Sequence, residues 1–183
     1  MNLIVDWILE RVPGKRVLDI GCFSGLYGGL LKQHSPDRYV VGCDLDLSGL
    51  RKAQRLLDDV VRTDATCLPF ISDTFDDAIS VEVIEHLTKP DGERLIQEAR
   101  RVSSRVTITT PNGWQRSGPE HLFEAHPLME HKSAWTVQDF ARLGATQIRG
   151  TGWKLPFKGL RHFLWFIPYW VPLFGNNIIA VFS

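Results

Sequence analysis

The stretch Val17–Gly29, VLDIGCFSGLYGG, decides the fold of this 183-residue chain. The apolar residues at its start are typical of a short buried strand, and the leucines that follow the stretch's glycines recur at helical spacing. Gly21 and Gly25 predict a tight turn between them, because glycine adopts positive φ angles and lets a ligand approach the backbone. The helix start adds unpaired N–H groups that point at such a ligand. Strand, turn and helix together predict the opening unit of a nucleotide-binding α/β fold.

The glycine spacing indicates which ligand this turn binds. It lacks the GxGxxG offsets of a dinucleotide-binding turn, and an acidic residue just before it suits a cationic ligand better than a pyrophosphate. The pattern DxGCxxG resembles motif I of the class I S-adenosylmethionine (SAM) methyltransferases, in particular the type 11-like group. The resemblance implies cofactor binding by Asp19, Gly21, Cys22, Phe23 and Gly25, with the carboxylate and the turn holding the amino-acid end. Phe23 stands where most relatives carry glycine, so it is either tolerated or narrows the methionine pocket.

Two further strand ends carry acidic residues. Asp44 follows the predicted strand 39–43 and is placed to accept hydrogen bonds from ribose hydroxyls, or alternatively to cap the next helix. Leu45 beside it is expected to lie against the adenine face. After a third strand, DATCLPFISDTFDD resembles the family's DAxxLPF…FD pattern. That resemblance implies that Asp64 reaches the adenine amino group, with Ala65 beside it in the pocket. Three motifs in this order predict SAM as the cofactor.

The sequence EVIEH at residues 82–86 combines two carboxylates and an imidazole at the end of a predicted strand over 78–83. These groups suit Mg²⁺ or Mn²⁺. The spelling ExxEH resembles the metal motif of the small-RNA 2′-O-methyltransferases and of some ubiquinone-pathway O-methyltransferases, and the segment around His131 resembles a further part of the RNA enzymes' site. One interpretation is a metal centre of Glu82, Glu85, His86 and His131, the last three being catalytic. In the other, Glu82 lines the SAM pocket, and Glu85 and His86 support loop hydrogen bonds.

The order of strand and helix patterns predicts a single domain over residues 1–183. The expected fold is α/β: a doubly wound, seven-stranded, mostly parallel sheet of the Rossmann-like SAM methyltransferase type, with an antiparallel last strand at 178–182. Two inserted segments, 113–133 and 153–177, exceed what this scaffold needs, and long loops are usually functional. We expect them on the substrate side, with His121 and His126 as surface or pocket-lining groups.

The segment 153–174 is rich in aromatic residues mixed with basic ones. Three prolines interrupt it, and its continuous apolar part is too short to span a bilayer. One interpretation is a lid over the active site or a surface that packs against a second subunit of a homodimer. The other is peripheral attachment to a membrane, with Trp and Tyr at the headgroup level.

Composition narrows the class of partner. Lys plus Arg and Asp plus Glu both number 21, so no net charge draws the chain to nucleic acid, and no DNA partner is expected. Cys22, Cys43 and Cys67 form no CxxC pair, which predicts reduced thiols and a cytoplasmic location, with membrane association as the alternative. The stretch 1–12 carries acidic residues inside its apolar pattern, which predicts an amphipathic helix and not a signal peptide.

These observations predict a SAM-dependent methyltransferase that transfers a methyl group to a small-molecule or lipid-linked acceptor, at oxygen. Aligning the acceptor with the activated methyl group supplies much of the acceleration. An acceptor hydroxyl would in addition require a base or a metal ion. The alternatives are a catalytically silent SAM-binding module and a metal-dependent RNA 2′-O-methyltransferase.

Overall fold

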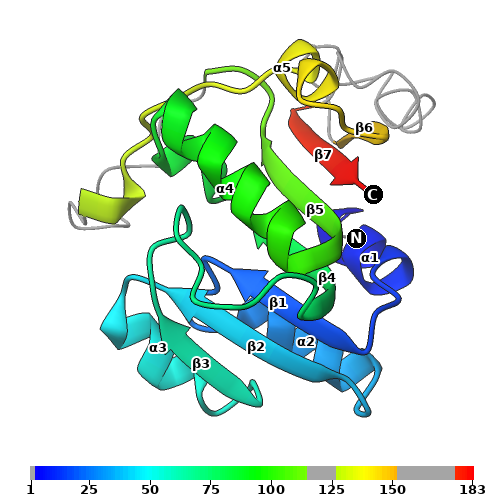
Figure 1. Cartoon of the computed structure of the whole chain (residues 1–183), viewed down its shortest axis with the longest axis vertical. Coiled ribbons are helices and arrows are strands. Elements are labelled where there is room, and N and C mark those ends of the chain that lie inside the picture. The colour runs from blue at the N-terminus through cyan, green and yellow to red at the C-terminus, as the bar shows by residue number, and fades with distance from the viewer. Residues whose placement is uncertain (1–2, 115–126, 152–175) are drawn as a thin grey trace, which may run out of the picture.

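The computed structural model describes residues 3–114, 127–151 and 176–183 (Figure 1). The predictions made for His121, His126 and the segment 153–174 lie outside these ranges. Within them, no helix has the length and apolar character needed to cross a membrane.

Seven strands form one sheet in the order β3-β2-β1-β4-β5-β7-β6. They are β1 Arg16–Ile20, β2 Tyr39–Asp44, β3 Asp59–Arg62, β4 Phe75–Val81, β5 Ser103–Pro111, β6 Gln147–Thr151 and β7 Asn177–Phe182. The first five strands pair in parallel, whereas β7 runs antiparallel to both β5 and β6. This topology confirms the predicted doubly wound α/β fold with an antiparallel last strand.

Helices cover both faces of the sheet (Figure 1). On one face, α1 Leu3–Arg11, α2 Leu26–His34 and α3 Leu47–Ala53 bury Trp7, Leu31 and Leu50 against β1, β2, β4 and β7. On the other, α4 Lys89–Val102 and α5 Val137–Arg142 bury a second cluster that contains Leu95 and Phe140. Because both faces are covered, the central strand β1 buries apolar residues on both of them, with Leu18 and Ile20 in one cluster and Val17 in the other.

The predicted strand over 78–83 is shorter at its C-terminal end than expected. β4 ends at Val81, because Glu82 adopts a left-handed backbone with φ of 54° that no strand accommodates. The predicted N-terminal amphipathic helix is present as α1, with Trp7 and Ile8 buried and Glu10 exposed. The three cysteines are free thiols, as predicted.

Candidate functional site

A cavity of about 470 Å³ opens at the carboxyl edge of the sheet. Its walls come from the glycine turn after β1, from the ends of β2, β3 and β4, and from the segment 128–132. In parallel α/β sheets the strand ends converge at this edge, which is where such folds bind ligands. The volume lies within the usual range for cofactor and small-molecule sites.

Most of the residues predicted to bind the cofactor line this cavity: Gly21, Cys22, Phe23, Asp44, Leu45, Asp64, Ala65 and Glu82. Asp19 and Gly25 do not. Asp19 is almost fully buried, and its Oδ2 accepts a hydrogen bond from the N–H of Gly28 at 2.9 Å. Burial raises the pKa of this carboxyl to about 7. The Asp19 carboxylate therefore supports the first turn of α2, and direct contact between Asp19 and the ligand stays a prediction.

The glycine turn is tied to β2 by its backbone. The N–H groups of Gly21 and Cys22 both donate to the carbonyl of Cys43, at 2.8 and 3.0 Å. Gly21 has a φ of 72°, and a Cβ added there would collide with the side chain of Val83. Glycine is therefore required at this position both by backbone conformation and by the close approach of Val83.

Backbone strain is concentrated at the cavity. Three non-glycine residues in the described part of the chain have positive φ angles, namely Phe23, Asp73 and Glu82. Phe23 and Glu82 both line the cavity. Such conformations are unfavourable and persist where the surroundings over-determine them, which happens most often at functional sites.

Asp44 is held by two backbone groups. Its Oδ2 accepts from the N–H of Phe23 and its Oδ1 from the N–H of Asp46, both at 2.8 Å. Each carboxylate oxygen retains a further lone pair for a ligand hydroxyl. The alternative prediction, that Asp44 caps the next helix, is wrong: Asp46 is the N-cap of α3 and accepts from the N–H of Ser48.

Glu82 is fixed by two residues that the sequence analysis did not identify. Its Oε1 accepts from the hydroxyl of Thr109 at 2.9 Å, and its Oε2 accepts from the side-chain amide of Asn177 at 3.1 Å. Thr109 lies in β5, and Asn177 is the first residue of β7. Nothing in the local sequence marks either residue, because only the insertion of β7 beside β5 brings Asn177 to Glu82.

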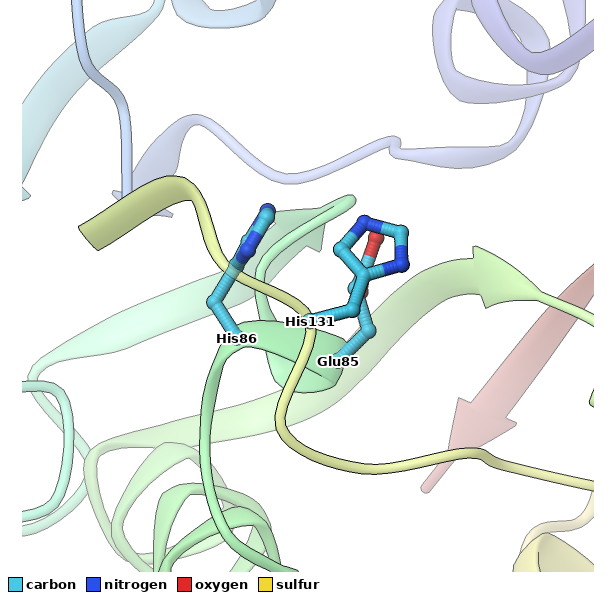
Figure 2. A group of neighbouring side chains, drawn as sticks. All are labelled: Glu85, His86 and His131. Atoms are coloured by element: carbon cyan, nitrogen blue, oxygen red, sulfur yellow. The ribbon is translucent and has the colours of Figure 1, made fainter. Parts of the chain in front are cut away.

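Beside this cavity, Glu85, His86 and His131 form a compact group (Figure 2). One possible ligand atom from each lies within 4.8 Å of the other two. Glu85 and His86 belong to the 3₁₀ helix η1 Ile84–His86, and His131 follows a second 3₁₀ helix, η2 Pro127–Met129. The predicted fourth member, Glu82, is not part of this group, because Thr109 and Asn177 hold its carboxylate elsewhere. The arrangement offers one carboxylate oxygen and two imidazole nitrogens.

The environment disfavours the charged forms of Glu85 and His86. Burial, together with the nearby carboxylate of Glu82, raises the pKa of Glu85 to about 8, while its Oε2 accepts from the hydroxyl of Thr110. Burial also lowers the pKa of His86, and a 3.2 Å hydrogen bond joins its Nδ1 to the carbonyl of Glu130. A neutral His86 that donates through Nδ1 leaves Nε2 as a lone-pair donor for a proton or a metal ion.

A family model described as "Methyltransferase domain" matches residues 17–105. Residues 17–105 are therefore a methyltransferase domain, and the structures that share its fold are class I SAM-dependent methyltransferases. The chain is 34% identical over 107 residues to the tRNA (carboxymethyluridine(34)-5-O)-methyltransferase of Arabidopsis thaliana, covering 58% of this chain and 24% of that protein. It is 31% identical over 99 residues to the malonyl-[acyl-carrier protein] O-methyltransferase of Herminiimonas arsenicoxydans, covering 52% and 38%. The chain therefore matches less than half the length of either relative.

Solved methyltransferase structures share the whole fold. A SAM-dependent methyltransferase from Archaeoglobus fulgidus aligns over 98% of this chain and 92% of its own, with a TM-score of 0.66 and 19% identity. The methyltransferase domain of bacterial CtHen1 aligns over 98% and 95%, with a TM-score of 0.63 and 21% identity. The family to which this domain is matched uses SAM as its cofactor.

The hydrogen bond from Thr109 to the Glu82 carboxylate gives a first testable prediction. We expect T109V to weaken binding of S-adenosylhomocysteine about three- to tenfold, because it removes a hydroxyl donor to a carboxylate that lines the cavity. T107V is the matched control: Thr107 is a buried threonine of the same strand, and its hydroxyl has no hydrogen-bond partner among the described residues. Calorimetric titration should show unchanged affinity for T107V. Equal affinities for the two variants would contradict the assigned role of Thr109.

Proposed function

We propose that this protein binds SAM in the cavity at the carboxyl edge of the sheet and transfers its methyl group to an oxygen of a small-molecule or lipid-linked acceptor. The observation that carries the proposal is the convergence of the glycine turn, Asp44, Asp64 and Glu82 on one cavity of about 470 Å³. When bound, SAM supplies a methyl carbon activated by its sulfonium. The protein's task is then to align an acceptor with that carbon, and alignment alone can supply much of the rate enhancement.

The lining residues fit the parts of SAM. Gly21 and Cys22 line the cavity, and the missing side chain of Gly21 lets the ligand approach the backbone there. Asp44 retains carboxylate lone pairs that can accept hydrogen bonds from the ribose hydroxyls. Leu45, which is partly exposed, and Ala65 offer apolar surface to the adenine. The carboxylate of Glu82 suits the positively charged methionine end. Carboxylates are the groups expected to favour a ligand that carries a sulfonium.

The acceptor would enter where the cavity is not walled by cofactor motifs. His86, Leu128, Met129 and Lys132 line this part. The names of the two relatives describe oxygen methylation of acceptors that carry carboxyl groups, a carboxymethyluridine and a malonyl group. Because a carboxylate is deprotonated at neutral pH, methylation of such an acceptor needs no general base. This supports oxygen as the acceptor atom.

Transfer of label from [methyl-³H]SAM into a host lysate tests the proposal. The lysate should be separated into lipid, soluble small-molecule, protein and RNA pools after incubation with the protein. Label in the lipid or small-molecule pool supports the proposed acceptor class, and label in RNA supports an RNA methyltransferase instead. If S-adenosylhomocysteine binds but none is produced from SAM with any pool, the protein is a silent SAM-binding module.

A second candidate function is metal-assisted methylation of a hydroxyl, which the group Glu85, His86 and His131 favours. These residues would hold the ion, and two imidazoles with one carboxylate suit Mn²⁺ better than Mg²⁺. A bound divalent ion stabilises a deprotonated hydroxyl as a Lewis acid. The nearby Thr110 and the carbonyl of Glu130 would orient the Glu85 and His86 ligands through the hydrogen bonds described above.

Metal removal and direct titration test this candidate. We expect Mn²⁺ to bind the wild-type protein in calorimetry and H131A to weaken that binding by at least about tenfold, because one of three ligands is lost. H34A is the control, since His34 ends α2 away from the cavity and is exposed. If Mn²⁺ does not bind and EDTA leaves the methylation rate unchanged, the three residues serve only as pocket wall and loop support.

A further inference from the structure

Phe23 occupies the cofactor-binding turn in a conformation that phenylalanine rarely adopts. Its φ is 43°, the residue is 39% exposed, and it lines the cavity. Its N–H donates to the carboxylate of Asp44 at 2.8 Å, so the left-handed backbone aims this group at the residue proposed to bind the ribose. Something outside the turn must hold this conformation in place.

The structure points to α3 as that support. Gly49 is buried within α3 and lies directly against Phe23. A Cβ added at Gly49 would lie 2.8 Å from the Phe23 ring atom Cδ2, 2.8 Å from its carbonyl oxygen and 2.9 Å from its carbonyl carbon. Two of these three atoms are backbone, so a side chain at position 49 could not be accommodated by rotating the ring. The peptide of Phe23 would have to move.

A glycine inside a helix is unfavourable relative to alanine, so its presence in α3 requires a reason. The close approach of Phe23 supplies one. Lys52, one turn further along α3, places its ammonium 5.9 Å from the centre of the same ring. The start of α3 is in turn fixed to Asp44 through the N–H of Asp46. The turn, Asp44 and the first half of α3 thus form one connected unit.

We infer that Gly49 is a positioning residue of the cofactor site: by giving Phe23 room, it keeps the Phe23 N–H on Asp44 and the Asp44 carboxylate directed at the ribose. The inference rests on the proposed function, since it assumes a SAM-type ligand in this cavity. It also assigns a role to Phe23 in motif I. The ring lies close to Gly49 of α3 while Phe23 also lines the cavity.

The test measures binding of S-adenosylhomocysteine and of its analogue that lacks both ribose hydroxyls. We expect the wild-type protein to prefer the natural ligand, and G49A to lose about tenfold in affinity together with most of that preference, because Asp44 no longer faces the ribose. G29A is the matched control. Gly29 lies in α2, where an added Cβ would come no closer than 3.3 Å to the side chain of Leu56.

The ribose preference separates positioning from packing. If G49A lowers the melting temperature but keeps the wild-type preference, or if G49A binds like G29A, the inference is overturned while the proposed function stands. If the wild-type protein binds neither ligand, the proposed function fails and the inference falls with it. Should G49A not fold, the F23G/G49A double variant decides. Glycine at 23 removes the ring contact but leaves the two backbone contacts to the Cβ at position 49, so the peptide is still displaced and the ribose preference should still be lost. A folded double variant that keeps the wild-type preference overturns the inference.

Discussion

Replacing Trp135 with alanine should lower the free energy of unfolding by about 3–5 kcal/mol, the usual range for truncating a buried aromatic side chain. Trp135 is fully buried and stacks on Phe140, with ring centres 5.4 Å apart. Its Nε1–H donates to the hydroxyl of Ser133 at 2.9 Å. Its ring fills the space above Gly92, where an added Cβ would collide with it. The variant therefore leaves a cavity and removes a hydrogen bond.

The same change should affect the site, because Trp135 anchors the segment that carries His131. The N–H groups of Lys132 and Ser133 donate to the carbonyl of Glu85, and Ser133 is the partner of Trp135. W114A is the control: Trp114 is 64% exposed, and its loss should change the free energy of unfolding by less than about 0.5 kcal/mol. Chemical denaturation of both variants measures this difference. A W135A protein as stable as W114A would refute the anchoring role.

We expect the D44A variant to bind S-adenosylhomocysteine more weakly by about 1.5–3 kcal/mol, because the ligand loses charge-assisted hydrogen bonds to its ribose. The structure adds a second reason. The Asp44 carboxylate accepts hydrogen bonds from the N–H groups of Phe23 and Asp46. Its removal therefore also breaks the hydrogen bonds that hold the glycine turn and the start of α3. Isothermal titration calorimetry at fixed pH and ionic strength measures the loss directly.

D37A is the charge-matched control for this experiment. Asp37 is exposed and precedes β2, whereas Asp44 ends that strand, so the two residues lie at opposite edges of the sheet. The control removes one negative charge without touching the cavity, and its affinity should equal that of the wild-type protein. If D44A and D37A bind equally well, the assignment of Asp44 to the ribose is wrong.

Short-range patterns in the sequence were sufficient to predict the strands and helices of the α/β scaffold, whereas the antiparallel last strand was predicted from the family resemblance. The strand–turn–helix unit depends on residue periodicity and on glycine's access to positive φ, both of which act over a few residues. The same holds for Asp44 and Asp64. A residue at the end of a parallel strand reaches the common edge of the sheet whatever its neighbours are. These local rules explain why most of the predicted cofactor residues line one cavity.

Only the tertiary structure decided how those residues are held. Thr109 and Asn177 reach Glu82 because β7 inserts antiparallel beside β5, and no local pattern encodes that neighbour. Asp19 lies behind the turn because burial and the N–H of Gly28 fix its carboxylate there. The group Glu85, His86 and His131 joins residues 45 positions apart without Glu82, and Gly49 contacts Phe23 across two elements. Except for the pair Asp19 and Gly28, which lie nine positions apart, the deciding contacts join segments that are distant in the chain. Such contacts depend on sheet order, register and close packing, whereas sequence periodicity reports only which face of an element is buried.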